Sequence, residues 1–180
     1  MSAMRRCQGF SLVEVMVALV VCAIGLLGLA KMESLAVSST AVASARSLAA
    51  IQASSLAASM HANRGYWAAG LAPASFTVTP SAMPQISDAG LSSAAPNNCS
   101  VPGAGSCTAD QMAAYDVQQW AQGLLTLLPG SFSTISCTTV GIPVTCTIQI
   151  QWTENAVAVN QQQTNLNALQ APTYVLYVQP

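Results

Sequence analysis

One acidic residue interrupts a long apolar segment near the start of the chain. From Phe10 to Ala30 the sequence is almost uniformly hydrophobic, yet Glu14 lies four residues into this segment. A carboxylate near the centre of a bilayer costs roughly 3 kcal/mol on insertion scales, and membrane acids usually mark a functional position. We therefore expect Glu14 to meet a cationic group. A protonated or snorkelling carboxyl without a partner is the alternative.

The six cysteines divide by region. Cys7 precedes the apolar segment, Cys22 lies inside it, and the polar remainder holds Cys99, Cys107, Cys137 and Cys146. Four cysteines in a compact exported domain suggest two disulfides, for which three connectivities are possible. None of their spacings is typical of a zinc site, so we favour structural disulfides over a metal. Disulfides imply an oxidising compartment outside the cytoplasm.

Residues that could catalyse a reaction are scarce. Beyond Arg64 the charged groups are Asp88, Asp110, Asp116 and Glu154. The sequence contains no G-x-S-x-G, no glycine-rich phosphate loop and no metal-ligand spacing. The single histidine, His61, is expected near the end of a helix, where a cation or a surface residue is common. We expect no enzymatic activity, no cofactor and no metal.

The composition is too apolar for an ordinary soluble domain. Hydrophobic residues make up 52% of the 180 residues and charged residues 6%, whereas about a quarter of a soluble domain is charged. Part of the chain should therefore lie in lipid or in an apolar assembly. The formal net charge of −1 provides no basic field for nucleic acid, so we expect no nucleic-acid partner.

The apolar segment is long enough to span a membrane. It contains 21 residues, and a helix rising about 1.5 Å per residue then covers a hydrocarbon core of roughly 30 Å. Arg5 and Arg6 precede it, whereas Lys31 follows and is balanced by Glu33. The positive-inside rule predicts a cytoplasmic N-terminus and a translocated remainder. An ordinary secretory signal would have a shorter apolar core and a clear cleavage site after it.

The junction "GFSLVEVMVALVV" resembles the N-terminal signature of type IV pilin precursors. It combines a short basic leader ending in Gly9, Phe10 at the start of the hydrophobic helix, and an acid, Glu14, at the fifth position counted from Phe10. The resemblance implies that a prepilin peptidase cuts between Gly9 and Phe10 and methylates the new Phe10 amine. Glu14 could then pair with the Phe10 amine of a neighbouring subunit, setting register rather than adding affinity.

Two further segments resemble minor pilins of type IVa pili, namely Val17 to Ala36 and "WAQGLLTLLPG" from Trp120 to Gly130. This resemblance implies a low-abundance subunit in the minor-pilin complex that primes pilus assembly and lies at or near the tip. Its partners would be other minor pilins, the major pilin, the prepilin peptidase, the inner membrane and the pilus assembly platform. A minor pseudopilin of type II secretion is the alternative, and a bitopic periplasmic binding protein is a third hypothesis.

The resemblance also implies a location and a division of the chain. The protein would cross the inner membrane once, with its C-terminal domain in the periplasm, before it enters the pilus fibre at the cell surface. We expect residues 1–9 to form the leader peptide and residues 10–30 the transmembrane or filament-core half of the first helix. Residues 31–62 would form its amphipathic half, and residues 63–180 the globular domain.

One helix is expected from Phe10 to about Ala62. Beyond the membrane segment, apolar residues continue at helical spacing at Leu35, Val42, Ala45, Leu48, Ala49, Leu56 and Met60. Arg46 and Gln52 are assigned to the opposite face, which is rich in serine and alanine. The segment 63–106 is rich in glycine, proline and serine and is predicted to be a loop over this helix.

Aromatic residues should hold this loop in place. Tyr66, Trp67 and Phe76 are expected to be buried as anchors, and a carbohydrate-binding role for Tyr66 and Trp67 is the alternative. A second helix is predicted after Thr108, which forms a capping box with Gln111. This helix should end at Pro129 and Gly130.

Three strands are predicted in the C-terminal region. Residues 144–152 alternate strictly between apolar and polar, residues 132–140 form a shorter strand before them, and residues 173–178 follow a glutamine-rich loop at 161–170. A turn centred on Gly141 and Ile142 would place two cysteines opposite each other. The predicted fold class is therefore α+β, with a long N-terminal helix packed against a small antiparallel sheet and an additional helix, and the resemblance implies that this fold is pilin-like.

This strand register predicts the disulfides. Cys137 falls opposite Cys146 if the turn is centred as proposed, so these two should be joined across the strands. Cys99 and Cys107 are then left to close a small loop.

Overall fold

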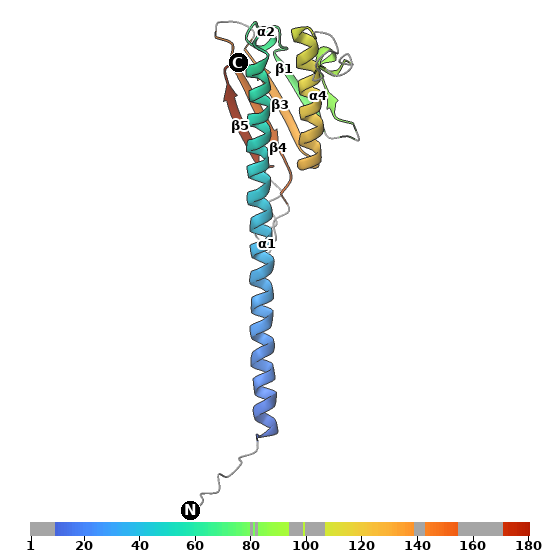
Figure 1. The fold of residues 1–180 in the computed structure, drawn as a ribbon. Coiled ribbons are helices and arrows are strands. Elements are labelled where there is room, and N and C mark those ends of the chain that lie inside the picture. Colours follow the sequence, from blue (N-terminus) through green and yellow to red (C-terminus); the bar gives the residue numbers. More distant parts are fainter. Residues whose placement is uncertain are drawn as a thin grey trace, which may run out of the picture.

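The computed structural model describes residues 10–79, 81, 83–93, 99, 107–138, 143–154 and 171–180. A long helix, α1 (Leu12–Ala62), projects from a small globular part made of a sheet and further helices (Figure 1). The N-terminal half of α1 extends away from the globular part, and its C-terminal half lies against it. The predicted α+β architecture is confirmed.

The two halves of α1 have different surroundings. Every residue from 10 to 34 is exposed, whereas one face of the C-terminal half is buried at Ala49, Gln52, Ala53, Leu56, Ala57 and Met60. The assignment of Gln52 to the outer face is wrong. It lies three residues after Ala49 and four before Leu56, so helical geometry puts it on the same face as both.

The described residues of the globular part form one antiparallel sheet of five strands in the order β2-β1-β3-β4-β5. The strands are β1 (Ser75–Thr79), β2 (Gln85–Ile86), β3 (Phe132–Cys137), β4 (Cys146–Gln151) and β5 (Thr173–Val178). The three predicted strands correspond to β3, β4 and β5. The predicted turn at 141–142 and the loop at 161–170 lie outside the described residues.

The prediction of a loop throughout 63–106 is wrong. This segment contains the helix α2 (Arg64–Trp67), the strands β1 and β2, and the helix α3 (Ala89–Ser92). β1 pairs with β3 along four residues, so it extends the sheet by one full strand. Its apolar residues Phe76 and Val78 do alternate with polar ones. This alternation covers only five residues in a segment rich in proline, glycine and serine, so it is too short to predict a strand.

Helix α4 (Ala109–Leu127) lies beside α1 across one face of the sheet (Figure 1). It begins with the predicted capping box, in which Gln111 Oε1 accepts the Thr108 backbone N–H at 3.0 Å. A hydrogen bond from the Thr108 side chain lowers the pKa of Asp110 in the first turn. After the helix, Gly130 has a φ of 76°, a conformation that glycine adopts without strain.

The core lies between these two helices and the sheet. Its largest fully buried side chains include Trp67, Phe76, Leu56, Met60, Leu124, Ile135, Ile148 and Ile150. Tyr66 and Trp67 pack edge to face with ring centroids 5.1 Å apart, and Phe76 lies 6.4 Å from Trp67. The three predicted aromatic anchors are therefore buried. Because both rings of the pair are inside the protein, neither offers a face on which a sugar could stack.

Two disulfides staple the globular part. Cys137 is joined to Cys146, its partner in the β3–β4 register, and Cys99 is joined to Cys107 just before α4. These are the two pairs expected from the strand register. Cys22 is a free, exposed cysteine on α1. Cys7 lies outside the described residues.

Candidate functional site

The residues of chemical interest in α1 lie on its projecting segment, which we define as residues 10–34. Its large apolar side chains are from 48% to 83% exposed, and they surround the helix instead of forming one stripe. A monomeric soluble protein rarely exposes a continuous apolar surface of this kind. By length and composition, α1 is able to cross a membrane. The surface of the projecting segment is therefore suited to contact with lipid or with other apolar helices.

Glu14 lies in the first turn of α1. The helix begins after Ser11, whose carbonyl accepts the Glu14 N–H at 3.1 Å and the Val15 N–H at 3.3 Å. The free N–H groups of a helix start favour a nearby carboxylate. Within the described ranges, the Glu14 side chain has no ion pair and no hydrogen bond, and it is exposed. Its carboxylate is therefore available to a group outside this chain.

Phe10 lies at the same end of the helix as Glu14. It precedes Ser11 and is 83% exposed. Because α1 begins at Leu12, Phe10 lies just before the first turn of the helix and Glu14 lies within that turn. Gly9, the other residue of the expected cleavage site, lies outside the described residues.

The first 30 residues can now be compared with known families. Residues 4–30 match the model of the prokaryotic N-terminal methylation motif. This match supports a type IV pilin-like family, which includes both pilins and pseudopilins. Such a motif implies a membrane-anchored protein that is processed by a prepilin peptidase and assembles with other pilins. No curated protein and no solved structure matches the chain.

A second notable site lies where α1 leaves the globular part. Arg46 donates two hydrogen bonds to Glu154, from Nε to Oε1 at 3.0 Å and from Nη2 to Oε2 at 3.3 Å. Trp152 Nε1 donates to the same carboxylate at 3.2 Å. The hydrogen bond and the charge of Glu154 raise the pKa of Arg46. This ion pair ties α1 to the segment after β4.

The sequence analysis missed this pair. Its two members are 108 residues apart, and Arg46 was assigned to an outer face without a partner. The only signal in the sequence was the low number of charged residues. In so apolar a chain, each isolated charge is a candidate for an ion pair with one of the few opposite charges. The structure holds no group of three or more His, Cys, Asp or Glu side chains that could bind a metal within the described ranges.

Proposed function

We propose that this chain is a minor pilin of a type IV pilus, similar to PilV of type IVa pili. In this proposal it belongs to the minor-pilin complex that primes pilus assembly and lies at or near the tip. The observation that carries the proposal is the position of Glu14. It is an exposed acid in the first turn of a helix of 51 residues, inside a matched methylation motif and next to an exposed apolar surface.

The chemistry begins with processing. Cleavage between Gly9 and Phe10 releases the leader and creates a positive amine at Phe10, which is then methylated. A neighbouring α1 that is shifted along the helix axis brings its Phe10 amine beside Glu14. In an apolar environment, loss of one partner leaves a buried charge that costs several kcal/mol. The pair therefore selects one axial register among the many that apolar contacts alone would allow.

The proposal assigns a role to each part of the chain. Residues 1–9 are the leader, and residues 10–30 span the inner membrane before they enter the filament core. Residues 31–62 connect this core to the globular domain, residues 63–180, which faces first the periplasm and later the fibre surface. The other minor pilins, the major pilin and the assembly platform are the expected partners.

Two measurements on the native strain test this function. First, the chain from sheared pili should have the mass of a polypeptide that starts at a methylated Phe10. Second, Glu14→Gln should lower the amount of chain in the pili by at least about tenfold, because it removes the charge and retains the shape. Glu33→Gln is the matched control, since it removes an exposed acid farther along the same helix. Equal incorporation of all three chains would contradict the proposal.

A minor pseudopilin of type II secretion is the second candidate, because the methylation motif fits both classes equally well. A deletion strain separates them when it is scored for surface pili and for exported enzymes. Loss of pili with normal secretion supports the minor pilin. Loss of secretion with normal pili supports the pseudopilin. A chain that retains Met1 would instead favour a bitopic protein with no filament role.

A further inference from the structure

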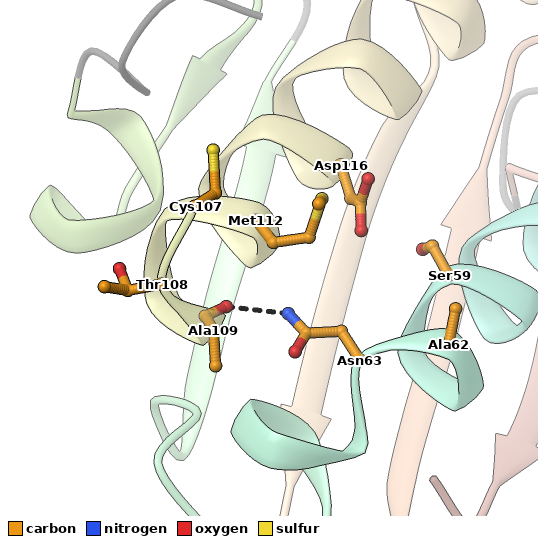
Figure 2. Close-up of a pocket in the computed structure, with 8 residues that line it drawn as sticks. All are labelled: Ser59, Ala62, Asn63, Cys107, Thr108, Ala109, Met112 and Asp116. Carbon is orange, nitrogen blue, oxygen red and sulfur yellow. Dashed lines mark hydrogen bonds between the residues drawn. The ribbon is translucent and has the colours of Figure 1, made fainter. Parts of the chain in front are cut away.

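An open pocket of about 500 Å³ lies between the end of α1 and the start of α4 (Figure 2). Ala62, Ala109 and Met112 supply apolar atoms to its wall, and Ser59, Asn63 and Asp116 supply polar ones. In Figure 1 both helix ends are at the end of the globular part that is farthest from the N-terminus. The pocket therefore lies near the end of the globular part opposite the projecting segment.

Of the described residues that line this pocket, Asp116 is the one that carries a charge. Figure 2 shows its side chain extending from α4 toward the space between the two helices. Two polar groups of the wall donate elsewhere, since Asn63 Nδ2 donates to the Ala109 carbonyl at 2.7 Å and the Ser59 hydroxyl to the Leu56 carbonyl at 2.9 Å. Among the described residues, none donates a hydrogen bond to the Asp116 carboxylate.

The surroundings of Asp116 disfavour its charged form. Burial raises the pKa of this carboxyl, and no neighbouring positive charge acts in the opposite direction. A half-buried carboxylate without a donor weakens the fold, because burial removes water without supplying a replacement partner. A partner from another molecule would supply both the missing donor and the missing charge.

We propose that this pocket binds a lysine or arginine side chain of a neighbouring pilin subunit. Asp116 pairs with the ammonium or guanidinium group, and the apolar wall at Ala62, Ala109 and Met112 covers the methylene stem of the same side chain. Negative charge and an apolar wall together suit a long cationic side chain better than a small inorganic cation, which prefers several oxygen ligands.

The position of the pocket indicates which neighbour contributes this side chain, and this step rests on the proposed function. In a filament whose α1 helices run in the same direction, the end of each domain opposite the projecting segment faces the next subunit on that side. Glu14 and Asp116 would then contact neighbours through opposite ends of one chain.

Photo-crosslinking in the native strain tests the inference on the full chain. A diazirine amino acid at Ala62, an exposed residue on the pocket wall, should crosslink to a pilin peptide that contains a lysine or arginine. Asp116→Asn should reduce this yield by about tenfold, as expected for loss of one partner of a shielded charge pair. Asp110→Asn is the matched control, because it removes the same charge six residues earlier on α4 from a position outside the pocket. It should leave the yield unchanged.

A charge exchange then identifies the pair. Asp116→Lys should abolish the crosslink, and changing the mapped basic residue of the neighbour to Asp should restore it. An unchanged yield in Asp116→Asn, or a crosslink to a molecule that is not a pilin, would overturn the inference. Failure of the proposed function is distinguishable in the same samples, because it leaves the N-terminus unprocessed. Failure of the inference alone leaves a processed chain whose crosslink yield is unchanged in Asp116→Asn.

Discussion

The two halves of α1 form one continuous helix but differ in what surrounds their apolar residues. The projecting segment, residues 10–34, has large apolar side chains on all sides and none of them is buried. The C-terminal half is rich in alanine and serine and buries a single face beneath α4 and the sheet. The apolar residues of the first half are therefore free to contact other molecules, whereas those of the second half pack against the globular part of the same chain. A helix can separate these tasks because its backbone hydrogen bonds are internal in both environments.

The comparison predicts its largest effect in the buried half. Leu56 is completely buried, so Leu56→Ala should lower the free energy of unfolding of the globular part by about 3 kcal/mol through lost burial and a cavity. Leu26 is 66% exposed on the projecting segment, and Leu26→Ala should leave this stability unchanged. Denaturant titrations of both full-length variants in detergent, followed by tryptophan fluorescence, measure the difference. Equal losses would show that the two halves form one cooperative unit.

The disulfide between β3 and β4 should have the next largest effect. It closes a loop with a sequence separation of 9 residues, for which the chain-entropy model gives about 2–3 kcal/mol. Replacing both Cys137 and Cys146 with alanine should therefore destabilise the sheet and leave the helicity of the projecting segment intact. Circular dichroism with peptide mass mapping checks both points. Mapping that joined Cys99 to Cys146 in the parent protein would contradict the register of these strands.

Two tryptophans provide a smaller, paired test of how α1 is held. Trp120 Nε1 donates to the Gln52 carbonyl on α1 at 2.8 Å, so Trp120→Phe should cost about 1–2 kcal/mol from the lost hydrogen bond and lost volume. Trp67 Nε1 is buried without an acceptor among the described residues. Trp67→Phe loses volume too, but it also removes an unsatisfied donor, and it should cost less. Thermal unfolding of the two variants shows which substitution costs more stability.

The smallest effect concerns Asp116 and depends on pH. Burial raises its pKa, so the folded state binds a proton more tightly than the unfolded state does. Stability then falls as the pH rises from the ordinary aspartate pKa of about 4 through the raised folded value. Asp116→Asn should slightly raise the melting temperature at pH 7, and this gain should vanish below pH 4.

Asp110, on the same helix, should have the opposite effect on the pH dependence of stability. The Thr108 hydrogen bond lowers its pKa, so its contribution to stability is present above the ordinary aspartate pKa and is lost as the pH falls through the lower folded value. Asp110→Asn should therefore slightly lower the melting temperature at pH 7. Melting curves between pH 3 and pH 7 test both residues. A gain for both variants would mean that net charge, not local environment, sets their effects.

Local patterns in the sequence predicted much of this fold. The unbroken apolar periodicity of α1, the capping box at Thr108 and the alternation in β4 each report on a few adjacent residues, and each is present in the structure. The pairing of Cys137 with Cys146 followed from the position of one turn. These features are predictable because the chain itself decides them over short distances.

Contacts between distant segments were not predictable in the same way. The ion pair between Arg46 and Glu154 joins segments 108 residues apart, and β1 becomes a strand because β3 offers it a partner. The pocket at Asp116 arises where the ends of two helices meet. In each case the deciding contact is tertiary, and no local pattern encodes it.

Crosslinking from the start of α1 in purified filaments tests the central claim most directly. A photo-reactive residue at Val13, beside Glu14, should attach to the first residues of a neighbouring subunit, with both chains beginning at their methylated N-termini. Glu14→Gln should shift or abolish this crosslink by releasing the register. A crosslink of unchanged position and yield in Glu14→Gln would contradict the account, as would a chain that reaches the filament with Met1 still in place.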